Sequence, residues 1–250
     1  MAATTCARCA SVGDRPVEAG DEYTLHAVHF ACWIRAVFAA AEIRRLQNSP
    51  MHGSLQPGLF EQIASSPVRI ADDAEGGIVY RSGFIDAALA DRWFEVLRDT
   101  IDWQAQRRPM YDRVVAVPRL VASFRLDAEG LPAPLADAAG RLRRELDVPF
   151  NTVGLNHYRD GRDSVAPHND KLHSLVPGHS IALLSLGARR RMTIRAKQPP
   201  RRVQHVELAH GSLLLMSHDS QRHFDHGIPK TREAVGPRIS LAFRVRPSAG

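Results

Sequence analysis

The stretch HSIALLSLGARRRMTIRA, residues 179–196, decides the fold class, because two short apolar segments follow each other with a Gly-containing break between them. The same texture recurs in TVGLNHY (152–158), RVQHVELAHGSLLLM (202–216) and PRISLAFRVR (237–246), with Gly, Pro and Asp turns between the segments. Many short strands at close spacing predict an all-β barrel or a double-sheet jelly roll.

Two helices are expected to flank this β-structure. The segment DAALADRWFEVLRD (86–99) begins with a capping aspartate, Asp86, and repeats apolar side chains at Leu89, Trp93 and Leu97. Residues 134–146 predict a second helix, residues 77–84 a strand, and RPMYDRVVAVPRLVASFRL (108–126) a pair of hairpin strands. The predicted fold class is therefore α+β, mainly β, with a double-stranded jelly roll and flanking helices.

A small zinc-binding module is expected at the N-terminus. All three cysteines lie in the spacing Cys6-x2-Cys9-x19-His29-x2-Cys32, with His26 as an alternative to His29. Two thiolates two residues apart offer both sulfurs to one tetrahedral Zn(II), and four protein ligands close the site, so it would be structural. Metal would also supply much of the folding energy of so small a unit. The pattern is similar to a treble-clef or LIM-like zinc finger.

Composition and linkers suggest how the chain is divided and where it acts. We expect a zinc-finger-like module with a helix at 1–47, a linker NSPMHGSLQPG at 48–58, and the main domain at 59–250. The 250 residues contain no apolar run of about 18 residues, which argues against a membrane span. The start of the chain lacks the pattern of a secretory signal, which favours an intracellular protein, cytoplasmic or nuclear. For the oligomeric state, we expect a monomer.

Charge is distributed unevenly along the chain. Residues 1–155 contain 17 arginines against 20 acidic residues, whereas residues 156–250 contain 16 basic residues against 7 acidic ones. A basic domain attracts polyanions through phosphate contacts and counterion release. The C-terminal part, with its run Arg189, Arg190 and Arg191, therefore predicts a nucleic-acid partner, and the zinc module is expected to bind nucleic acid or a protein.

The segment NHYRDGRDSVAPHND contains a candidate metal site. His168 and Asp170 stand two residues apart, so they share one face of an extended strand. With a second histidine from further along the chain they would form a two-histidine, one-carboxylate set, which leaves positions open on Fe(II) for a bidentate cosubstrate and O2.

Six ordered motifs between residues 156 and 244 resemble the AlkB family of 2-oxoglutarate- and Fe(II)-dependent dioxygenases. They are NHYRDGRDS (156–164), HND (168–170), SLGA (185–188), HGSLLLM (210–216), HFDHGIP (223–229) and PRISLAFR (237–244). The resemblance implies a double-stranded β-helix with His168, Asp170 and His226 as iron ligands. His223 is the rival of His226, which we prefer because HGIP matches the family and HFD does not.

The last predicted strand suggests how 2-oxoglutarate is bound. Arg238, Ser240, Ala242 and Arg244 share one face by the period of two. An arginine fork suits the far carboxylate of this dianion. The resemblance assigns Arg238 to that carboxylate and places Arg244 near the iron-binding end, with hydrogen bonds added by Asn156 and Tyr158. Ser240 and Ala242 depart from the family pattern. The expected cofactors are Fe(II), 2-oxoglutarate, O2 and Zn(II).

The resemblance also implies a substrate. Relatives in the family act on N-alkylated bases of DNA or RNA, flipping the base beside the iron, so we expect oxidative dealkylation. Phe124, Tyr111 and Phe150 are the candidates for stacking the base, and Leu172 stands where base-repairing members carry an acidic residue. Leu172 favours an alternative, hydroxylation of a protein or small molecule; a nucleic-acid-binding module with a vestigial iron site is the second alternative.

Overall fold

The computed structural model describes residues 66–110 and 113–248 of the chain. The strands are β1 (Val68–Ala71), β2 (Ile78–Arg81), β3 (Gln104–Met110), β4 (Arg113–Arg125), β5 (Thr152–Tyr158), β6 (Val165–His168), β7 (Ile181–Gly187), β8 (Arg190–Ala196), β9 (Val203–Leu208), β10 (Ser212–Met216), β11 (Phe224–Ile228) and β12 (Arg238–Arg244). The α-helices are α2 (Ala87–Thr100), α3 (Ala133–Leu146) and α4 (Ser220–His223), and two short 3-10 turns are η1 (Asp73–Glu75) and η2 (Leu172–Ser174).

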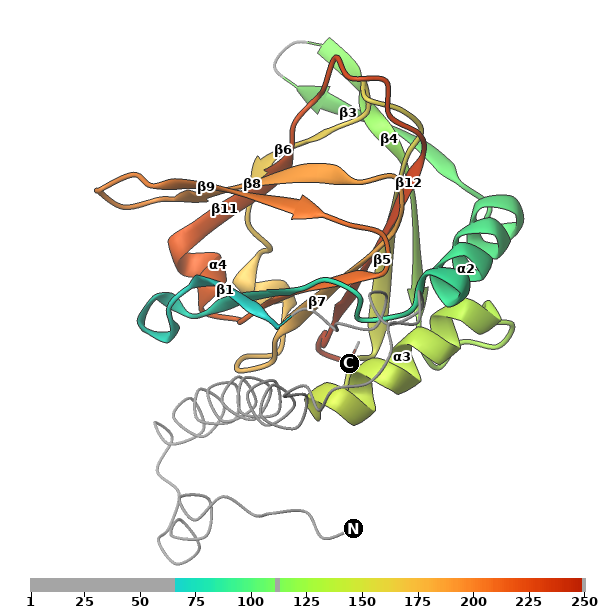
Figure 1. Ribbon diagram of the computed structural model, residues 1–250, viewed down its shortest axis with the longest axis horizontal. Coiled ribbons are helices and arrows are strands. Elements are labelled where there is room, and N and C mark those ends of the chain that lie inside the picture. Colours follow the sequence, from blue (N-terminus) through green and yellow to red (C-terminus); the bar gives the residue numbers. More distant parts are fainter. Residues whose placement is uncertain (1–65, 111–112, 249–250) are drawn as a thin grey trace, which may run out of the picture. The chain divides into compact units, whose positions relative to one another are not determined.

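The strands form two antiparallel sheets (Figure 1). The large sheet has the order β1-β2-β10-β7-β12-β5-β4-β3, and the small sheet has the order β6-β11-β8-β9. Neighbours far apart in sequence, such as β12 between β5 and β7, are typical of a jelly roll. An apolar cluster that includes Leu183, Leu214, Met192, Ile194 and Phe224 comes from strands of both sheets, so the sheets enclose a common core.

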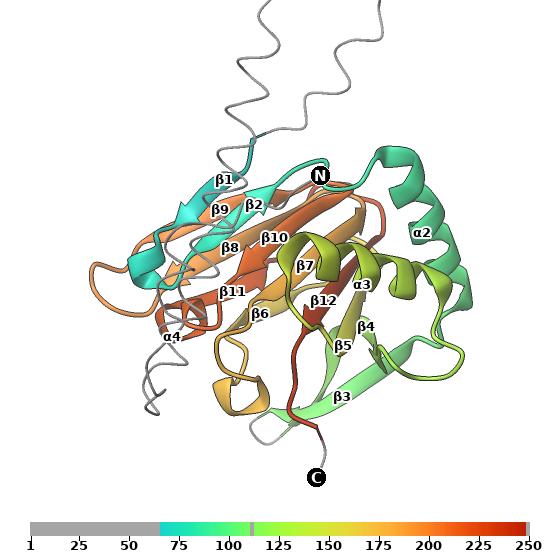
Figure 2. The ribbon, with the colours of Figure 1, turned by 90° about the horizontal axis from the view of Figure 1, so that it is seen from below.

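Helices α2 and α3 lie along the outer face of the large sheet (Figure 2). Helix α2 begins where predicted, because the Asp86 carboxylate accepts a hydrogen bond from the Leu89 backbone N–H at 2.8 Å. Trp93 and Leu97 are buried on one side of it. Helix α3 ends at Asp147, which adopts a left-handed conformation with φ of 51°. The helices thus cover the sheet face that does not point into the core between the sheets.

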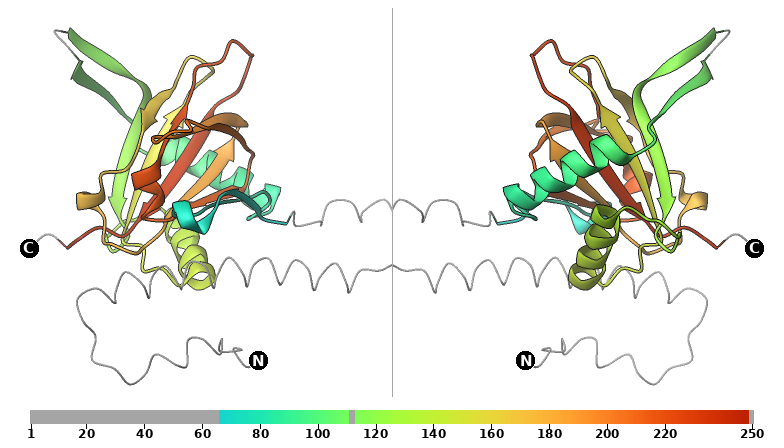
Figure 3. Two further views of the ribbon diagram at one scale, coloured as in Figure 1. Left: turned by 90° about the vertical axis from the view of Figure 1, so that its left-hand side faces the viewer. Right: turned by 90° about the vertical axis from the view of Figure 1, so that its right-hand side faces the viewer.

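The long hairpin of β3 and β4 extends past the body of the domain (Figure 3). β3 pairs with β4 from the turn, where Met110 lies opposite Arg113, as far as Gln104, which lies opposite Val121. The remainder of β4, up to Arg125, pairs with β5 alone. This hairpin forms one wall of the cavity described below.

These elements confirm the predicted mainly β fold with antiparallel sheets and both predicted long helices. In the described ranges, no helix is long and apolar enough to cross a membrane. The predicted zinc module with Cys6, Cys9, His26, His29 and Cys32, and the linker at 48–58, lie outside the described residues.

Candidate active site

Two histidines predicted as metal ligands lie side by side on neighbouring strands of the small sheet. His168 on β6 and His226 on β11 are direct partners in the antiparallel ladder. Their ring centroids lie 4.6 Å apart. His223, the rival ligand, is the last residue of α4. The ladder thus brings His168 beside His226.

Both imidazole rings are held in a form suited to binding a metal. The His168 Nδ1 lies 2.9 Å from the Ala166 carbonyl oxygen, which can only accept, so Nδ1 donates this hydrogen bond and Nε2 is the ring nitrogen that remains for a metal. Burial, followed by the neighbouring His168, lowers the pKa of His226 to about 4, although Asp170 opposes this shift. His226 is therefore neutral at pH 7, as a metal ligand must be.

The third predicted ligand, Asp170, is bonded to an arginine from the last strand of the large sheet. Arg244 donates from Nε and NH2 to the two carboxylate oxygens at 2.7 and 3.1 Å. Burial opposes ionisation of Asp170, but Arg244 and the two histidines outweigh it and lower its pKa. Its backbone N–H donates to Oε1 of the buried Gln221 at 3.0 Å, a contact that the sequence did not indicate.

Within residues 66–110 and 113–248, no three histidine, cysteine or acidic side chains are already gathered as around a metal. The Asp170 carboxylate is engaged by Arg244 instead. The donor set still fits Fe(II), because the two imidazoles are ladder partners on β6 and β11 and the ionised carboxylate of Asp170 follows β6 by two residues.

The predicted cofactor residues meet on the inner face of β5 and β12. Arg238 is the ladder partner of Tyr158, and Ser240 is the ladder partner of Asn156. The Arg238 guanidinium carbon lies 5.2 Å from the centroid of the Tyr158 ring. The period-two alternation predicted for β12 therefore places these four residues next to one another.

Arg238 is a buried cation with unused hydrogen-bond donors. Only 1% of its surface is exposed, and burial lowers its pKa to about 10, so it is charged at pH 7. Its NH2 donates to Ser185 Oγ at 2.8 Å, whereas Nε and NH1 have no partner. A buried cation with two unpaired donors is costly unless an anion completes it. A carboxylate such as the distal one of 2-oxoglutarate fits this position.

A cavity of about 750 Å³ lies beside these residues. Its lining includes His168 and Arg244 from the candidate iron site and Asn156 from the cofactor strand. Phe124, predicted to stack a base, and its neighbour Ser123 line the same cavity from β4.

Leu172, the other apolar residue predicted at the substrate site, is half-buried in the turn η2, two residues after Asp170. Tyr111, the second stacking candidate, lies outside the described residues. Phe150 has no exposed surface and packs against Phe243 with ring centroids 6.1 Å apart. Its predicted role in stacking a base is therefore wrong, because a ring buried in the core cannot reach a ligand.

The arginine run 189–191 divides between the surface and the interior. Arg189 and Arg191 are exposed, and Arg191 pairs with Glu207 at 2.8 Å. Arg190 is only 3% exposed and donates to the backbone carbonyls of Asp160, Asp163 and Pro229 at 2.8 to 2.9 Å. The predicted phosphate contact of Arg190 is therefore wrong, because both terminal nitrogens of its guanidinium group donate to backbone carbonyls inside the protein.

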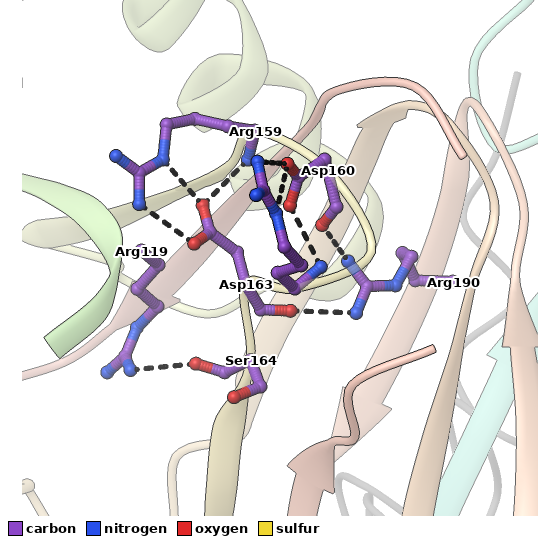
Figure 4. A network of polar contacts seen from close by, with 7 residues as sticks. Arg119, Arg159, Asp160, Asp163, Ser164 and Arg190 are labelled. Carbon is purple, nitrogen blue, oxygen red and sulfur yellow. Dashed lines mark hydrogen bonds and ion pairs between the residues drawn. The ribbon is translucent and has the colours of Figure 1, made fainter. Parts of the chain in front are cut away.

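Figure 4 shows the loop that Arg190 holds, between β5 and β6. Within it the Asp163 carboxylate accepts hydrogen bonds from the backbone and side chain of Arg159. Arg119 on β4 reaches the Ser164 carbonyl at the other end of the loop. The loop joins the strand of Asn156 and Tyr158 to the strand of His168, so these contacts fix both strands relative to each other.

Comparisons with known proteins indicate the family of the chain. Residues 77–244 match the model of the 2OG-Fe(II) oxygenase superfamily. DNA oxidative demethylase ALKBH2 of Homo sapiens is 34% identical over 180 residues, which cover 63% of this chain and 69% of that protein. The Mus musculus ALKBH2 is 40% identical over 180 residues, which cover 63% and 75%.

A second group of relatives covers more of the chain. The alpha-ketoglutarate-dependent dioxygenase alkB homolog 3 of Mus musculus is 33% identical over 208 residues, which cover 76% of this chain and 73% of that protein. Among solved structures, a Pseudomonas putida prolyl-4-hydroxylase aligns with 68% of this chain and 93% of its own, at 14% identity and a TM-score of 0.47.

Proposed function

Because the chain belongs to the AlkB branch of the 2OG-Fe(II) oxygenase superfamily, we propose that it removes alkyl groups oxidatively from N-alkylated bases of DNA. It is a 2-oxoglutarate-dependent dioxygenase by family. The observation that carries the choice of DNA is that relatives 34% and 40% identical to this chain are named DNA oxidative demethylases. RNA bases are the nearest variant of the same chemistry.

The chain offers a place for each reactant. His168, Asp170 and His226 would hold Fe(II), and Arg238, with Tyr158 and Asn156, would hold 2-oxoglutarate. When bound, iron and 2-oxoglutarate supply with O2 the oxidising chemistry that hydroxylates the alkyl carbon. The hydroxylated N-alkyl group is unstable and leaves as an aldehyde, which restores the base.

The protein's own residues would orient the substrate. Phe124 lines the cavity and would stack a flipped base there, and because His168 lines the same cavity, the alkyl group would lie near the metal. The exposed Arg189 and Arg191 offer phosphate contacts outside the cavity. Sequence-independent phosphate contacts and one flipped base are sufficient to recognise a lesion without reading its neighbours.

A turnover screen tests the proposal. The purified chain, loaded with Fe(II) and supplied with 2-oxoglutarate, is incubated with single- and double-stranded DNA and RNA that contain 1-methyladenine or 3-methylcytosine. Release of formaldehyde together with succinate, above the level with unmodified oligonucleotide, is expected. Succinate formation that a protein extract stimulates, and that no alkylated oligonucleotide does, would replace this proposal with protein hydroxylation.

We also propose that Cys6, Cys9, His29 and Cys32 bind one structural zinc ion. The support is the sequence spacing alone, since these residues lie outside the described ones. Elemental analysis of the full chain should give one zinc per molecule, Cys9→Ser should remove it, and His26→Ala should leave it in place. A zinc content that Cys9→Ser does not change would contradict the proposal.

A further inference from the structure

Arg119 lies on β4 at the boundary between the cavity and the cofactor strand β5. Its Nε donates to Oδ1 of Asn156 at 2.6 Å, a short distance for a hydrogen bond from a charged donor. Its NH1 donates to the Ser164 carbonyl oxygen at 3.3 Å (Figure 4). Arg119 and Asn156 both line the cavity and both are half-buried.

This contact fixes which end of the Asn156 amide faces which way. A guanidinium group has donors and no acceptor, so only the amide oxygen can face Arg119. The Nδ2 group, which carries two N–H donors, is then turned away from Arg119. Asn156 is the ladder partner of Ser240, and Tyr158 and Arg238 form the neighbouring pair on the same face. A rotated amide would instead place donors against donors, which is unfavourable.

We propose that Arg119 is a positioning residue for 2-oxoglutarate. By holding Oδ1 of Asn156, it keeps Nδ2 available to donate to a carboxylate of the cofactor. The inference rests on the proposed function, because it takes 2-oxoglutarate as the anion bound between β5 and β12. Arg119 itself acts through Asn156.

Binding measurements separate this role from a contact with substrate or a purely structural one. The full chain is loaded with Mn(II), which fills the metal site without turnover, and 2-oxoglutarate binding is measured by calorimetry with no nucleic acid present. Arg119→Gln should weaken binding about tenfold, as expected when one hydrogen bond to a charged group is lost. Arg119→Lys keeps a charge and a donor but not the planar fork, so it should weaken binding about threefold.

A double-mutant cycle tests whether the effect passes through Asn156. Asn156→Ala should weaken binding about tenfold by removing the Nδ2 donor. In the Asn156→Ala background, adding Arg119→Gln should have no further effect. Asn156→Asp keeps an acceptor for Arg119 but replaces the Nδ2 donor by a second acceptor oxygen, whose negative charge repels the cofactor carboxylate, so it should weaken binding more than Asn156→Ala.

Arg125 provides a matched control on the same strand. It lies six residues further along the same face of β4 but is exposed and pairs with Asp127 at 2.7 Å. Arg125→Gln should leave 2-oxoglutarate binding unchanged. The inference is wrong if Arg119→Gln binds 2-oxoglutarate as wild type does, or if its effect persists in full without Asn156. Wild-type protein that binds no 2-oxoglutarate would instead refute the proposed function.

Discussion

Arg190 on β8 and Arg238 on β12 are both almost fully buried, with 3% and 1% of their surface exposed, but their guanidinium groups are bonded differently. Arg190 donates to three backbone carbonyls, and Arg238 donates to one serine hydroxyl and leaves Nε and NH1 unpaired. A buried cation whose donors are satisfied by the backbone stabilises the fold. A buried cation with free donors costs folding energy and is ready to bind an anion.

The largest effect that tests this contrast is expected from Arg190→Ala. It leaves the carbonyls of Asp160, Asp163 and Pro229 without their donor, at a cost of about 3 kcal/mol or more in the free energy of unfolding. Urea denaturation of the metal-free chain measures this loss. Arg189→Ala and Arg191→Ala, on exposed neighbours, should each change stability by less than about 1 kcal/mol. An Arg190→Ala protein as stable as these controls would contradict the structural role.

Arg238→Met should give the opposite result. The unfolding free energy without ligand should stay the same or rise, because a costly buried charge is replaced by an apolar side chain of similar length. The affinity for 2-oxoglutarate should fall about 100-fold as two charge-assisted hydrogen bonds are lost. The affinity of the Arg238→Lys variant should fall less, about tenfold, since a point charge replaces the planar guanidinium fork.

Thermal unfolding with and without 2-oxoglutarate, on Mn(II)-loaded protein, measures both properties of Arg238→Met. At a 2-oxoglutarate concentration well above the wild-type Kd, the ligand should raise the wild-type Tm by an amount that grows with the logarithm of its concentration, and it should raise the Tm of the variant much less. If the variant is destabilised without ligand by as much as Arg190→Ala, the two arginines play the same role and the contrast between them is lost.

Local periodicity predicted much of this site. Alternation along β12 placed Arg238 and Ser240 on one inward face, as the ladder with β5 confirms. The same rule applied to β8 predicts that Arg190 shares a face with Met192 and Ile194, both buried. The charge of the run 189–191 obscures that signal, because three adjacent arginines are typical of one exposed surface patch.

Long-range contacts were not predictable in the same way. The pair of Asp170 with Arg244 joins residues 74 apart in sequence, and the contact of Arg119 with Asn156 joins residues 37 apart. Each depends on the order of strands in the sheets, which residue spacing does not encode. The direction of the Phe150 ring is not predictable for a related reason, since no period-two pattern extends through the loop before β5.

The smallest expected effect concerns the surface half of the arginine run. If DNA is bound through phosphates, the logarithm of the binding constant falls linearly with the logarithm of salt concentration, with a slope of about 0.9 per phosphate contact on duplex DNA. Arg189→Gln should reduce this slope by about one contact, and Arg191→Gln by no more than that, because Arg191 already pairs with Glu207. The run therefore supplies at most two contacts, since the third arginine is bonded inside.

Arg141→Gln, on the exposed side of α3, is the control and should leave the slope unchanged. Fluorescence anisotropy with a labelled duplex at several salt concentrations measures the slopes. Equal slopes for wild type and the Arg189→Gln variant would show that the DNA backbone is bound elsewhere on the basic domain.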